Sequence, residues 1–403
     1  MKIIKKDGTV EGWNGEKIKE AVYKAAARVN QYVEPDILDK LVEKVHSCLI
    51  IDRDAPTKDL HKEVIHYLRY FGLDDIANSY QEYRDYKNTY AKSFEKVKDE
   101  ADNVLLLGDR ENANFDSSLV STKGSLIKGY LTKELYRQFY LSKEEKELTK
   151  RGDIYIHDMR DMLMGSVNCC LFDIGNVLRG GFSMSNVDYT EPTSVLSALQ
   201  VIGDITLVAT AQQFGGFSLS QLDMVLLPYC EKTLKKAYKH AKHCFPDSDP
   251  SSWELYARRV LKDELKQGFQ SLELKLNTVP CSRGDFAFTT ISFGCWNAPQ
   301  WLGRYLNDTD LWILKEICEA ILTTRMNGHG ENHKPVVFPK LVYLYEENYL
   351  SAFQEAHDVF ELAIECSSKC MYPDFLSLTG DWAHSSVGKQ YMENKQVVTP
   401  MGA

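Results

Sequence analysis

The stretch "FAFTTISFG" (286–294) decides the fold class of this chain, because it is a short apolar run that ends at a glycine. Such a run is typical of a buried β-strand. Three further runs are predicted to be strands: "GDIYIHD" (152–158), "NCCLFDI" (168–174) and "KPVVFPKLVYLY" (334–345). Between them, the segments Pro192 to Phe214 and Ser220 to Cys244 have the pattern of long helices. Strands that alternate with helices predict an α/β architecture with parallel pairing.

The N-terminal segment has a different pattern. Residues 2–13 are predicted to form a β-hairpin, because the turn signal Asp7-Gly8 lies between two alternating apolar runs. Asn14 follows the hairpin and is a suitable N-cap for a helix. The apolar residues after Asn14 recur at helical spacing, so a helix is expected to start there.

Two more helices are predicted before the α/β part begins. One starts near Thr57, and the next runs through "DDIANSYQEYRDYKNTYAKSF" (74–94). The polar stretch "KVKDEADN" (96–103) then indicates a boundary. We therefore expect an N-terminal domain at residues 1–92 and a second domain at residues 93–403.

Composition excludes several classes of protein. The chain has 48 basic and 57 acidic residues and a net charge of −9, which argues against a nucleic-acid-binding surface along its whole length. No run of about 18 apolar residues indicates a membrane span, and the N-terminal residues lack the apolar stretch of a signal peptide. The ten cysteines include no pair at zinc-ribbon spacing. Free thiols in a reducing cytoplasm are the expected state.

The N-terminal hairpin carries basic residues that suit a phosphate chain. Lys5, Lys6 and Lys17 could converge on phosphates, with Glu11 and Asn14 available for polar contacts to a sugar or base. Lysine serves phosphate as a point charge, so these contacts need not be bidentate. The alternative interpretation is a solvated basic hairpin without a ligand.

The segment "GDIYIHDMRDMLMGSVNCCLFD" (152–173) joins a His-Asp pair to adjacent cysteines. This combination could indicate a metal site or a thiol nucleophile. The alternative is that both thiols are structural, since free cysteine is among the most buried residue types. Alternation along a strand puts Cys169 and Cys170 on opposite faces, so at most one of them faces a given cavity.

Three other clusters are interpreted as structural rather than functional. His240, His243 and Cys244 lie within five residues, but a solvated basic helix end is the preferred reading of that segment. Cys366 and Cys370 are expected to be core thiols. The stretch "NGHGENHK" (327–334) lacks the spacing of a phosphate-binding P-loop. No metal site is therefore predicted from the sequence.

The stretch "IIKKDGTVEGWNGEKI" (3–18) resembles the start of an ATP-cone, the nucleotide-sensing regulatory domain of ribonucleotide reductases. Six residues fall on the nucleotide-contacting pattern of that family: Lys5, Lys6, Glu11, Asn14, Lys17 and Thr57. The resemblance implies that ATP and dATP bind here as allosteric effectors. The sequence departs from the pattern at Trp13, where a smaller apolar residue is common.

The rest of the chain resembles the anaerobic, class III ribonucleoside-triphosphate reductase. Seven motifs occur in the order expected for that family: "GDIYIHD", "NCCLFDIGNVLRGGF", "QQFGGFS", "FTTISFG", "KPVVFPKLVY", "MYPDFLSL" and "TPMG". The resemblance implies the first half of a ten-stranded α/β barrel of the glycyl-radical enzyme type. The sequence departs from the family at Tyr155, where a histidine is frequent, and at Arg160-Asp161.

The same resemblance assigns roles to residues of this chain. Cys169 would lie under the substrate ribose and take part in its radical reduction, with Cys170 as its structural neighbour. Four residues would line the substrate pocket: His157, Asn168, Met401 and Gly402. The substrate would be a ribonucleoside triphosphate, which is reduced to a deoxyribonucleotide.

In the resembled family, a cysteine follows "TPMG" and becomes the thiyl radical that abstracts the ribose 3′ hydrogen. This chain has Ala403 at that position, and a methyl group cannot take that role. The glycyl radical and a zinc site would lie in a C-terminal part that these residues do not include. We therefore expect the chain to be inactive alone. The explanations left open are a shortened chain, a split gene, or a protein interrupted by an intein whose first residue is Ala403.

The resemblance also implies partners. They are a radical-SAM activating enzyme, a C-terminal reductase fragment and a second copy of the chain. The long helices between Pro192 and Cys244 are expected either to form the dimer interface or to pack on the second half of the barrel. Formate is an expected reductant. The rival hypothesis is a non-catalytic nucleotide-binding regulatory fragment.

Overall fold

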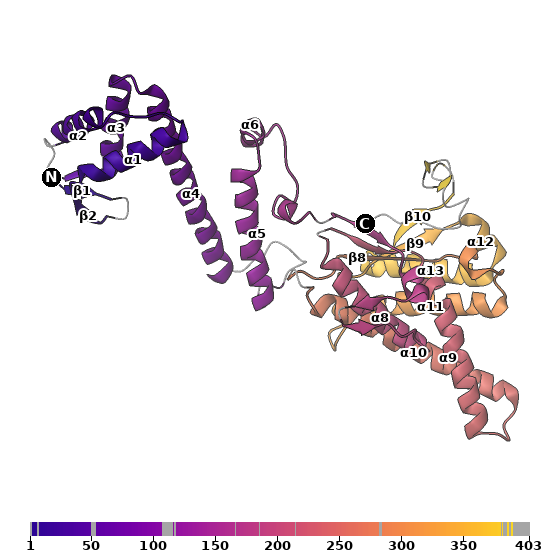
Figure 1. Ribbon diagram of the computed structural model, residues 1–403. Coiled ribbons are helices and arrows are strands. Elements are labelled where there is room, and N and C mark those ends of the chain that lie inside the picture. The colour runs from indigo at the N-terminus through magenta and orange to yellow at the C-terminus, as the bar shows by residue number, and fades with distance from the viewer. Residues whose placement is uncertain are drawn as a thin grey trace. The chain divides into compact units, whose positions relative to one another are not determined.

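The computed structural model describes residues 2–5, 8–49, 54–106, 116, 118–165, 167–184, 186–213, 215–281, 284–379, 381, 385, 386, 388 and 389 (Figure 1). The chain divides into two compact units, residues 1–99 and 100–403. The predicted domain boundary after residue 92 falls inside a continuous helix, α4 (Asp74–Leu106). The polar stretch 96–103 can be helical because it lacks glycine and proline and half of its residues, two Lys, one Glu and one Ala, are good helix formers.

The first unit is a small three-stranded sheet packed with helices. Its elements are β1 (Lys2–Ile4), β2 (Val10–Gly12), α1 (Gly15–Arg28), α2 (Pro35–Leu49), β3 (Asp54–Pro56), α3 (Thr57–Tyr70) and the start of α4. Strand β1 pairs antiparallel with β2 and parallel with β3, so the predicted hairpin is confirmed. The predicted cap is also confirmed, since the Asn14 side chain accepts hydrogen bonds from the first turn of α1.

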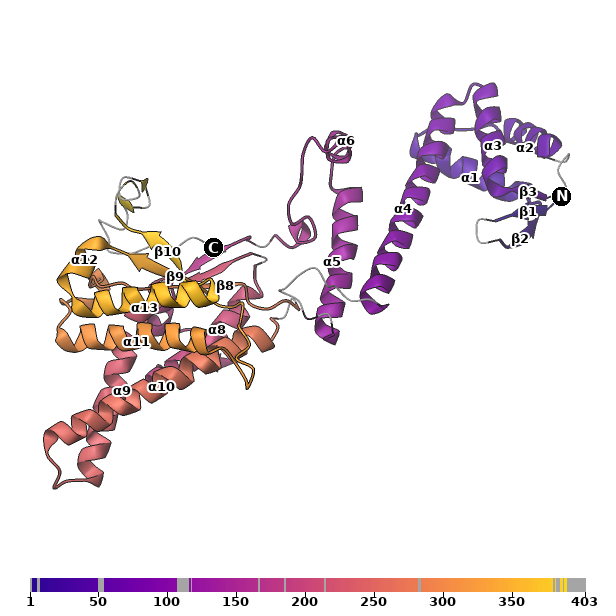
Figure 2. The same cartoon turned by 180° about the vertical axis from the view of Figure 1, so that it is seen from behind.

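The second unit alternates helices with parallel strands (Figure 2). Its helices of eight residues or more are α5 (Val120–Phe139), α6 (Lys143–Arg151), α8 (Val195–Thr210), α9 (Leu222–Cys244), α10 (Pro250–Thr278), α11 (Asp308–Asn327) and α13 (Gln354–Cys370). Shorter helical elements are η1 (Met162–Met164), α7 (Ile174–Gly180), η2 (Gln300–Leu302) and α12 (Glu347–Ala352). The two long helices predicted around residues 192–214 and 220–244 are confirmed as α8 and α9.

The main sheet has five strands, which pair in the order β10-β9-β8-β7-β4. They are β4 (Cys170–Phe172), β7 (Phe217–Leu219), β8 (Thr289–Phe293), β9 (Lys340–Tyr345) and β10 (Asp374–Ser377). Every pairing is parallel, so the predicted α/β architecture is confirmed. A separate hairpin joins β5 (Ser183–Met184) to β6 (Val187–Asp188).

The prediction of a strand at residues 152–158 is wrong. This segment follows α6, which ends at Arg151 and is capped by Gly152 with a left-handed φ of 83°. Strands form by pairing, and this segment pairs with no strand among the residues that the structure describes. The Tyr155 residue is 84% exposed, so the alternating apolar pattern of this segment does not correspond to buried side chains.

The core of the second unit lies where the strands meet the helices. Phe217 and Leu219 of β7 and Ile291 and Phe293 of β8 belong to one buried cluster with residues of the long helices. Figures 1 and 2 show α11 and α13 running alongside each other next to the sheet. The strand order follows the chain, and parallel strands are joined almost always by right-handed crossovers. Successive connecting helices are therefore expected on the same face of the sheet, which is the arrangement in the wall of an α/β barrel.

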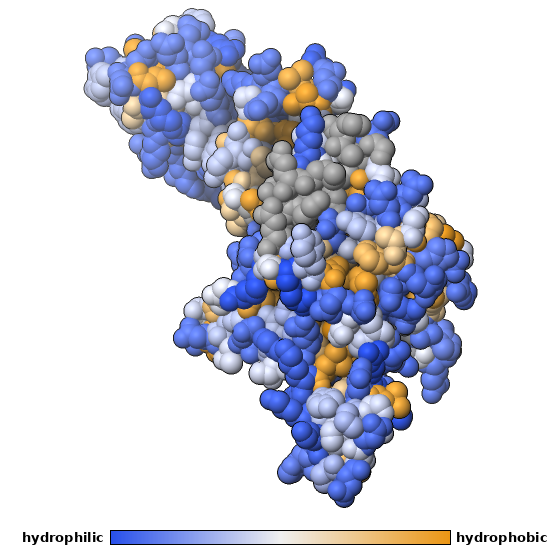
Figure 3. Space-filling model, turned by 90° about the vertical axis from the view of Figure 1, so that its right-hand side faces the viewer, coloured by the Kyte–Doolittle hydropathy of each residue, from blue (hydrophilic) through white to orange (hydrophobic). Residues whose placement is uncertain are grey.

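The surface in Figure 3 is mainly hydrophilic, with hydrophobic residues in smaller groups between the charged ones. None of the helices in the described part of the chain combines the length and apolar character needed to cross a membrane. All ten cysteines are free thiols.

Candidate functional site

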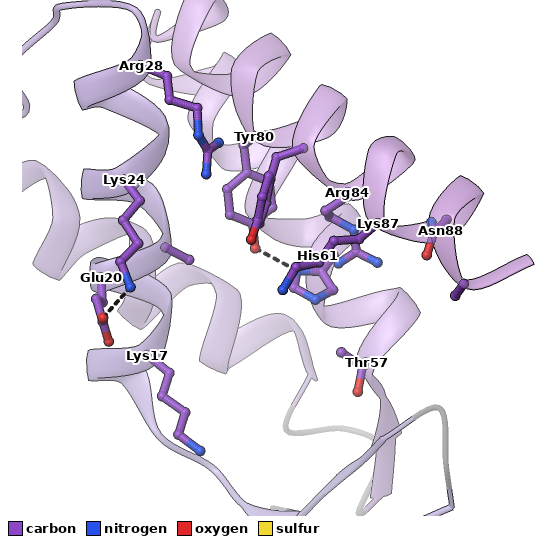
Figure 4. Close-up of a pocket in the computed structure, with 13 residues that line it drawn as sticks. Lys17, Glu20, Lys24, Arg28, Thr57, His61, Tyr80, Arg84, Lys87 and Asn88 are labelled. Atoms are coloured by element: carbon purple, nitrogen blue, oxygen red, sulfur yellow. Dashed lines mark hydrogen bonds and ion pairs between the residues drawn. The ribbon is translucent and has the colours of Figure 1, made fainter. Parts of the chain in front are cut away.

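A cavity of about 540 Å³ lies in the first unit between helices α1, α3 and α4 (Figure 4). Helix α1 lines it with Lys17, Lys24 and Arg28, which lie seven and eleven residues apart and therefore share one face of the helix. This volume is within the range of small-molecule sites. The cavity can therefore hold a ligand of nucleotide size.

The charge of the cavity favours an anion. Two more basic residues, Arg84 and Lys87, reach it from α4, opposite the basic residues of α1 (Figure 4). The carboxylate on the lining is Glu20, whose Oε1 lies 2.5 Å from Lys24 Nζ, and this contact lowers the pKa of Glu20. Five basic side chains against one paired carboxylate leave a strongly positive lining. Such a lining suits a phosphate chain.

Arg84 is the most distinctive residue of the cavity. Its guanidinium is partly buried, which lowers its pKa, and its Nη1 is buried without a hydrogen-bond partner among the described residues. A buried donor without a partner costs free energy. Arg84 is therefore a preformed donor that a phosphate oxygen would satisfy.

Aromatic side chains of α3 and α4 also line the cavity. His61 Nδ1 lies 2.6 Å from the hydroxyl oxygen of Tyr80, and burial raises the pKa of that hydroxyl. The ring of Tyr83 is covered by Arg28, whose Cζ lies 4.1 Å from the ring centroid, and by Lys87 Nζ at 5.0 Å. These rings offer a flat surface beside the cations, which suits a nucleobase.

Two of the residues predicted to bind nucleotide, Lys17 and Thr57, line this cavity. Glu11 is linked to it through Lys17, with which it forms an ion pair, and Glu11 also pairs with Lys5 at 2.7 Å. These two lysines, Lys17 first, lower the pKa of Glu11 to about 2. Lys6 lies outside the described residues.

Asn14, the sixth predicted residue, and Thr57 also position the site. Asn14 Oδ1 accepts hydrogen bonds from the backbone nitrogens of Glu16 at 3.0 Å and Lys17 at 3.4 Å, which fixes the start of α1. Thr57 Oγ1 donates to the carbonyl of Ile4 at 2.8 Å, which ties α3 to the hairpin. The Asn14 side-chain oxygen is therefore used by the helix cap.

Sequence reasoning missed the contribution of α3 and α4, namely His61, Tyr80, Arg84 and Lys87. A signal was present, since Tyr80, Arg84 and Lys87 recur at intervals of four and three residues and share one helix face. That face mixes aromatic and basic side chains, which is unusual for a core-facing stripe. That this face lines a cavity can be seen only from the packing of α4 beside α1.

The second candidate site is the thiol of Cys169, immediately before β4. Its Sγ accepts a hydrogen bond from the backbone nitrogen of Gly216 at 3.3 Å and donates to Asn168 Oδ1 at 3.5 Å. A Cβ on Gly215 would lie 2.5 Å from this sulfur and 2.2 Å from Asn168 Oδ1. Only glycine therefore allows the loop at 215–216 to approach the thiol so closely.

The neighbouring residues are arranged differently. Cys170 is the first residue of β4 and packs against the main core cluster, and burial raises the pKa of its thiol. His157 is exposed, and its Nδ1 contacts a carboxylate oxygen of Asp158. The roles predicted for His157 and Asn168 stay predictions, and Met401, Gly402 and Ala403 lie outside the described residues.

The clusters interpreted as structural show ordinary contacts. His240 Nε2 lies 3.6 Å from the sulfur of Cys244 on the same helix, and Cys366 is buried in the core. His329 of the segment 327–334 bonds Glu273 Oε2 at 3.0 Å. Among the residues that the structure describes, no group of three or more His, Cys, Asp or Glu side chains could hold a metal ion.

Comparison with known families gives two matches. The family described as "Anaerobic ribonucleoside-triphosphate reductase" matches residues 111–403. The "ATP cone domain" matches residues 1–89, which contain nearly all of the basic cavity. Together the two matches account for almost the whole chain.

Individual relatives agree with these matches. The anaerobic ribonucleoside-triphosphate reductase of Salmonella typhimurium is 30% identical over 384 residues, which cover 93% of this chain and 51% of that protein. The enzyme of enterobacteria phage T4 is 31% identical over 299 residues, or 72% of this chain and 44% of that protein. The Thermotoga maritima enzyme in complex with dATP and CTP superposes with a TM-score of 0.47 at 16% identity, covering 73% of this chain and 49% of that one. The chain thus spans about half the length of its curated relatives.

Proposed function

Because this chain belongs to the anaerobic ribonucleoside-triphosphate reductase family, we propose that it forms the effector-binding and substrate-thiol part of such an enzyme. Its N-terminal unit senses ATP and dATP. Its second unit contributes Cys169 to the reduction of a ribonucleoside triphosphate to a deoxyribonucleotide. The observation that carries the proposal is the basic cavity between α1, α3 and α4, within the part of the chain that matches the ATP cone.

The cavity supports nucleotide binding on two grounds. Its basic residues surround a space of about 540 Å³, and Arg84 has a buried donor without a partner among the described residues. Tyr83 and Tyr80 supply aromatic surface beside these charges. We assign the phosphates to Lys17, Arg84 and Lys87, and the base to the aromatic side of the cavity. Lys5, Lys6, Glu11 and Asn14 complete the site on the hairpin side.

Cys169 is proposed as the thiol that lies under the substrate ribose and takes part in its radical reduction. Its sulfur lies beside a glycine loop that leaves no room for another side chain, so its position is fixed by close packing. Asn168 and His157 are proposed to line the substrate pocket with Met401 and Gly402. A thiol can donate a hydrogen atom to a sugar radical, whereas the methyl group of Ala403 cannot start such a reaction.

The remaining chemistry is proposed to come from partners. A polypeptide that begins with cysteine would supply the abstracting thiol and the glycyl radical, and a radical-SAM enzyme would generate that radical. The five parallel strands would form half of the ten-stranded barrel. We also propose a homodimer through the long helices between Pro192 and Cys244, because Leu196 and Val208 of α8 expose 40% and 47% of their surface.

Calorimetry with ATP and dATP tests the effector site. Lys17→Ala and Arg84→Met should each weaken binding at least tenfold, whereas Lys40→Ala, on the exposed surface of α2, should leave it unchanged. If both cavity variants bind ATP like the unmodified chain, the effector site lies elsewhere.

Anaerobic product formation tests the catalytic role. The chain is assayed with CTP, the completing fragment and the activating enzyme, and Cys169→Ala and Cys170→Ala are compared. Deoxycytidine triphosphate should form with Cys170→Ala and not with Cys169→Ala. Turnover by Cys169→Ala would remove the assignment of that thiol, and a complete assembly that never forms product would favour a purely regulatory role.

A further inference from the structure

A second cavity, of about 430 Å³, lies in the second unit beside α5. Helix α5 forms one wall, the segment around η1 forms another, and the residues that follow α8 close it. None of the residues predicted from the sequence to bind nucleotide or substrate lines this cavity. Its lining is polar and charged, so the cavity suits a polar, charged ligand.

The wall formed by α5 is small, hydroxylated and basic. Ser121, Gly124, Ser125 and Lys128 follow one another at intervals of three, one and three residues, so they lie on one face of the helix. Small side chains leave the space open, the two hydroxyls can donate hydrogen bonds, and Lys128 adds a positive charge. An ideal Cβ on Gly124 would have no heavy atom within 4 Å, which shows that this part of the wall is open.

The opposite wall adds a second cation. Arg160 Nε donates to Asp161 Oδ2 at 2.9 Å, and both residues line the cavity. Arg160 also approaches α5 closely, since a Cβ on Gly129 would lie 3.3 Å from its Cδ. The carboxylate of the lining is thus paired within the cavity, and the lining keeps a net positive charge.

The cavity is joined to Cys169 by one short loop. Gln213 lines the cavity and is almost fully buried, and its Nε2 donates to the carbonyls of Gly215 at 3.1 Å and Gly216 at 2.7 Å. Gly216 in turn donates its backbone N–H to Cys169 Sγ at 3.3 Å. One hydrogen-bonded segment therefore forms part of the cavity wall and also contacts the thiol.

We propose that this cavity binds the triphosphate of the ribonucleoside triphosphate whose ribose lies at Cys169. A triphosphate needs cationic side chains and several hydrogen-bond donors, and Lys128, Arg160 and the hydroxyls of Ser121 and Ser125 supply them. Gln213 lines the phosphate subsite and bonds Gly215 and Gly216, which contact Cys169, so it fixes the position of the subsite relative to the thiol. The proposal rests on the proposed function of Cys169 and adds the residues that select a triphosphate.

Hydrogen–deuterium exchange of the 403-residue chain with inorganic triphosphate tests this subsite separately from the effector cavity. Peptides from α5 should gain protection in the unmodified chain. Lys128→Gln removes the charge, and Gly124→Leu fills the open wall while replacing glycine by a better helix former. Each should raise the triphosphate concentration needed for half-maximal protection of α5 at least tenfold.

Lys133→Gln is the matched control, because five residues along α5 turn its side chain about 140° away from Lys128. It should change the half-maximal concentration less than twofold. If α5 stays unprotected while peptides of α1 and α4 are protected, the phosphate subsite is refuted and the effector site stands. If α5 is protected equally in all variants, the subsite is also refuted.

Alkylation of Cys169 by iodoacetamide, followed by mass spectrometry, tests the link to the thiol. CTP should slow the alkylation at least fivefold, and inorganic triphosphate should not, because only CTP carries a ribose. In Lys128→Gln this shielding should need at least tenfold more CTP. CTP that shields the thiol equally well in Lys128→Gln would support the role of Cys169 and overturn the phosphate subsite.

Discussion

Replacing Arg84 by methionine should weaken nucleotide binding and stabilise the ligand-free protein at the same time. Arg84 holds a partly buried guanidinium whose Nη1 has no partner among the described residues. Methionine keeps much of the aliphatic packing and removes the desolvated charge. The two effects have opposite signs because the donor is satisfied only when an anion is bound.

The size of each effect follows from the environment of Arg84. A hydrogen bond from a charged donor contributes about 1.5–3 kcal/mol, so ATP should bind roughly 10- to 150-fold more weakly. An unsatisfied buried donor costs about 1–3 kcal/mol, and partial exposure puts Arg84 at the lower end. A gain of about 1 kcal/mol should raise the melting temperature of the first unit by about 4–8 °C.

Calorimetry with ATP and thermal unfolding followed by circular dichroism measure the two effects on one preparation. Arg69→Met, on the exposed surface of α3 and outside the cavity lining, is the matched control and should change neither quantity. Reduced stability of Arg84→Met together with unchanged affinity would refute the reasoning, because Arg84 would then be a structural residue.

Three further predictions concern other groups. Glu11, whose pKa is lowered to about 2 chiefly by Lys17, should titrate closer to its ordinary value of 4.5 in Lys17→Ala, as carbon-13 NMR would show; an unchanged midpoint would contradict the ion pair. Gly215→Ala should change the alkylation rate of Cys169 at least threefold, because its Cβ would lie 2.5 Å from the sulfur, whereas Gly180→Ala, with open space around it, should not. Burial raises the pKa of Asp223 from 3.8 to about 6, so the folded state holds this proton more tightly than the unfolded state does. Ionisation of Asp223 should therefore lower the free energy of unfolding of the second unit by about 3 kcal/mol as the pH rises from about 4 to 6. Urea denaturation at several pH values measures this change, and Asp223→Asn should not show it.

The sequence predicted those parts of the fold that depend on local chemistry. The β1–β2 hairpin, the Asn14 cap and the run at 286–294 are each encoded within a few residues of sequence. The segment 152–158 has an equally clear pattern, but a strand also needs a partner, and local alternation does not supply one. Start signals were overlooked for α10, whose Asp249 cap is followed by Pro250.

The basic cavity between α1, α3 and α4 shows the same limit. Lys17 and Thr57 could be named because they belong to a recognisable motif near the N-terminus. Arg84 and Lys87 lie about 70 residues beyond Lys17 in the chain and reach the cavity only through the packing of α4 against α1 and α3. The glycine loop beside Cys169 is a comparable case, since its role depends on a distance of 2.5 Å that no sequence pattern encodes.

The order of strands in the main sheet has a consequence for biosynthesis. Strands β4, β7, β8, β9 and β10 are neighbours in the order in which a ribosome makes them, so each new strand can dock on an edge that is already formed. Translation at 5–20 residues per second separates the emergence of β4 from that of β10 by roughly 10–40 s. During that interval the growing edge presents unpaired backbone groups, which are a template for aggregation. Chaperone binding to ribosome-bound nascent chains should therefore be strongest between the emergence of β7 and that of β10.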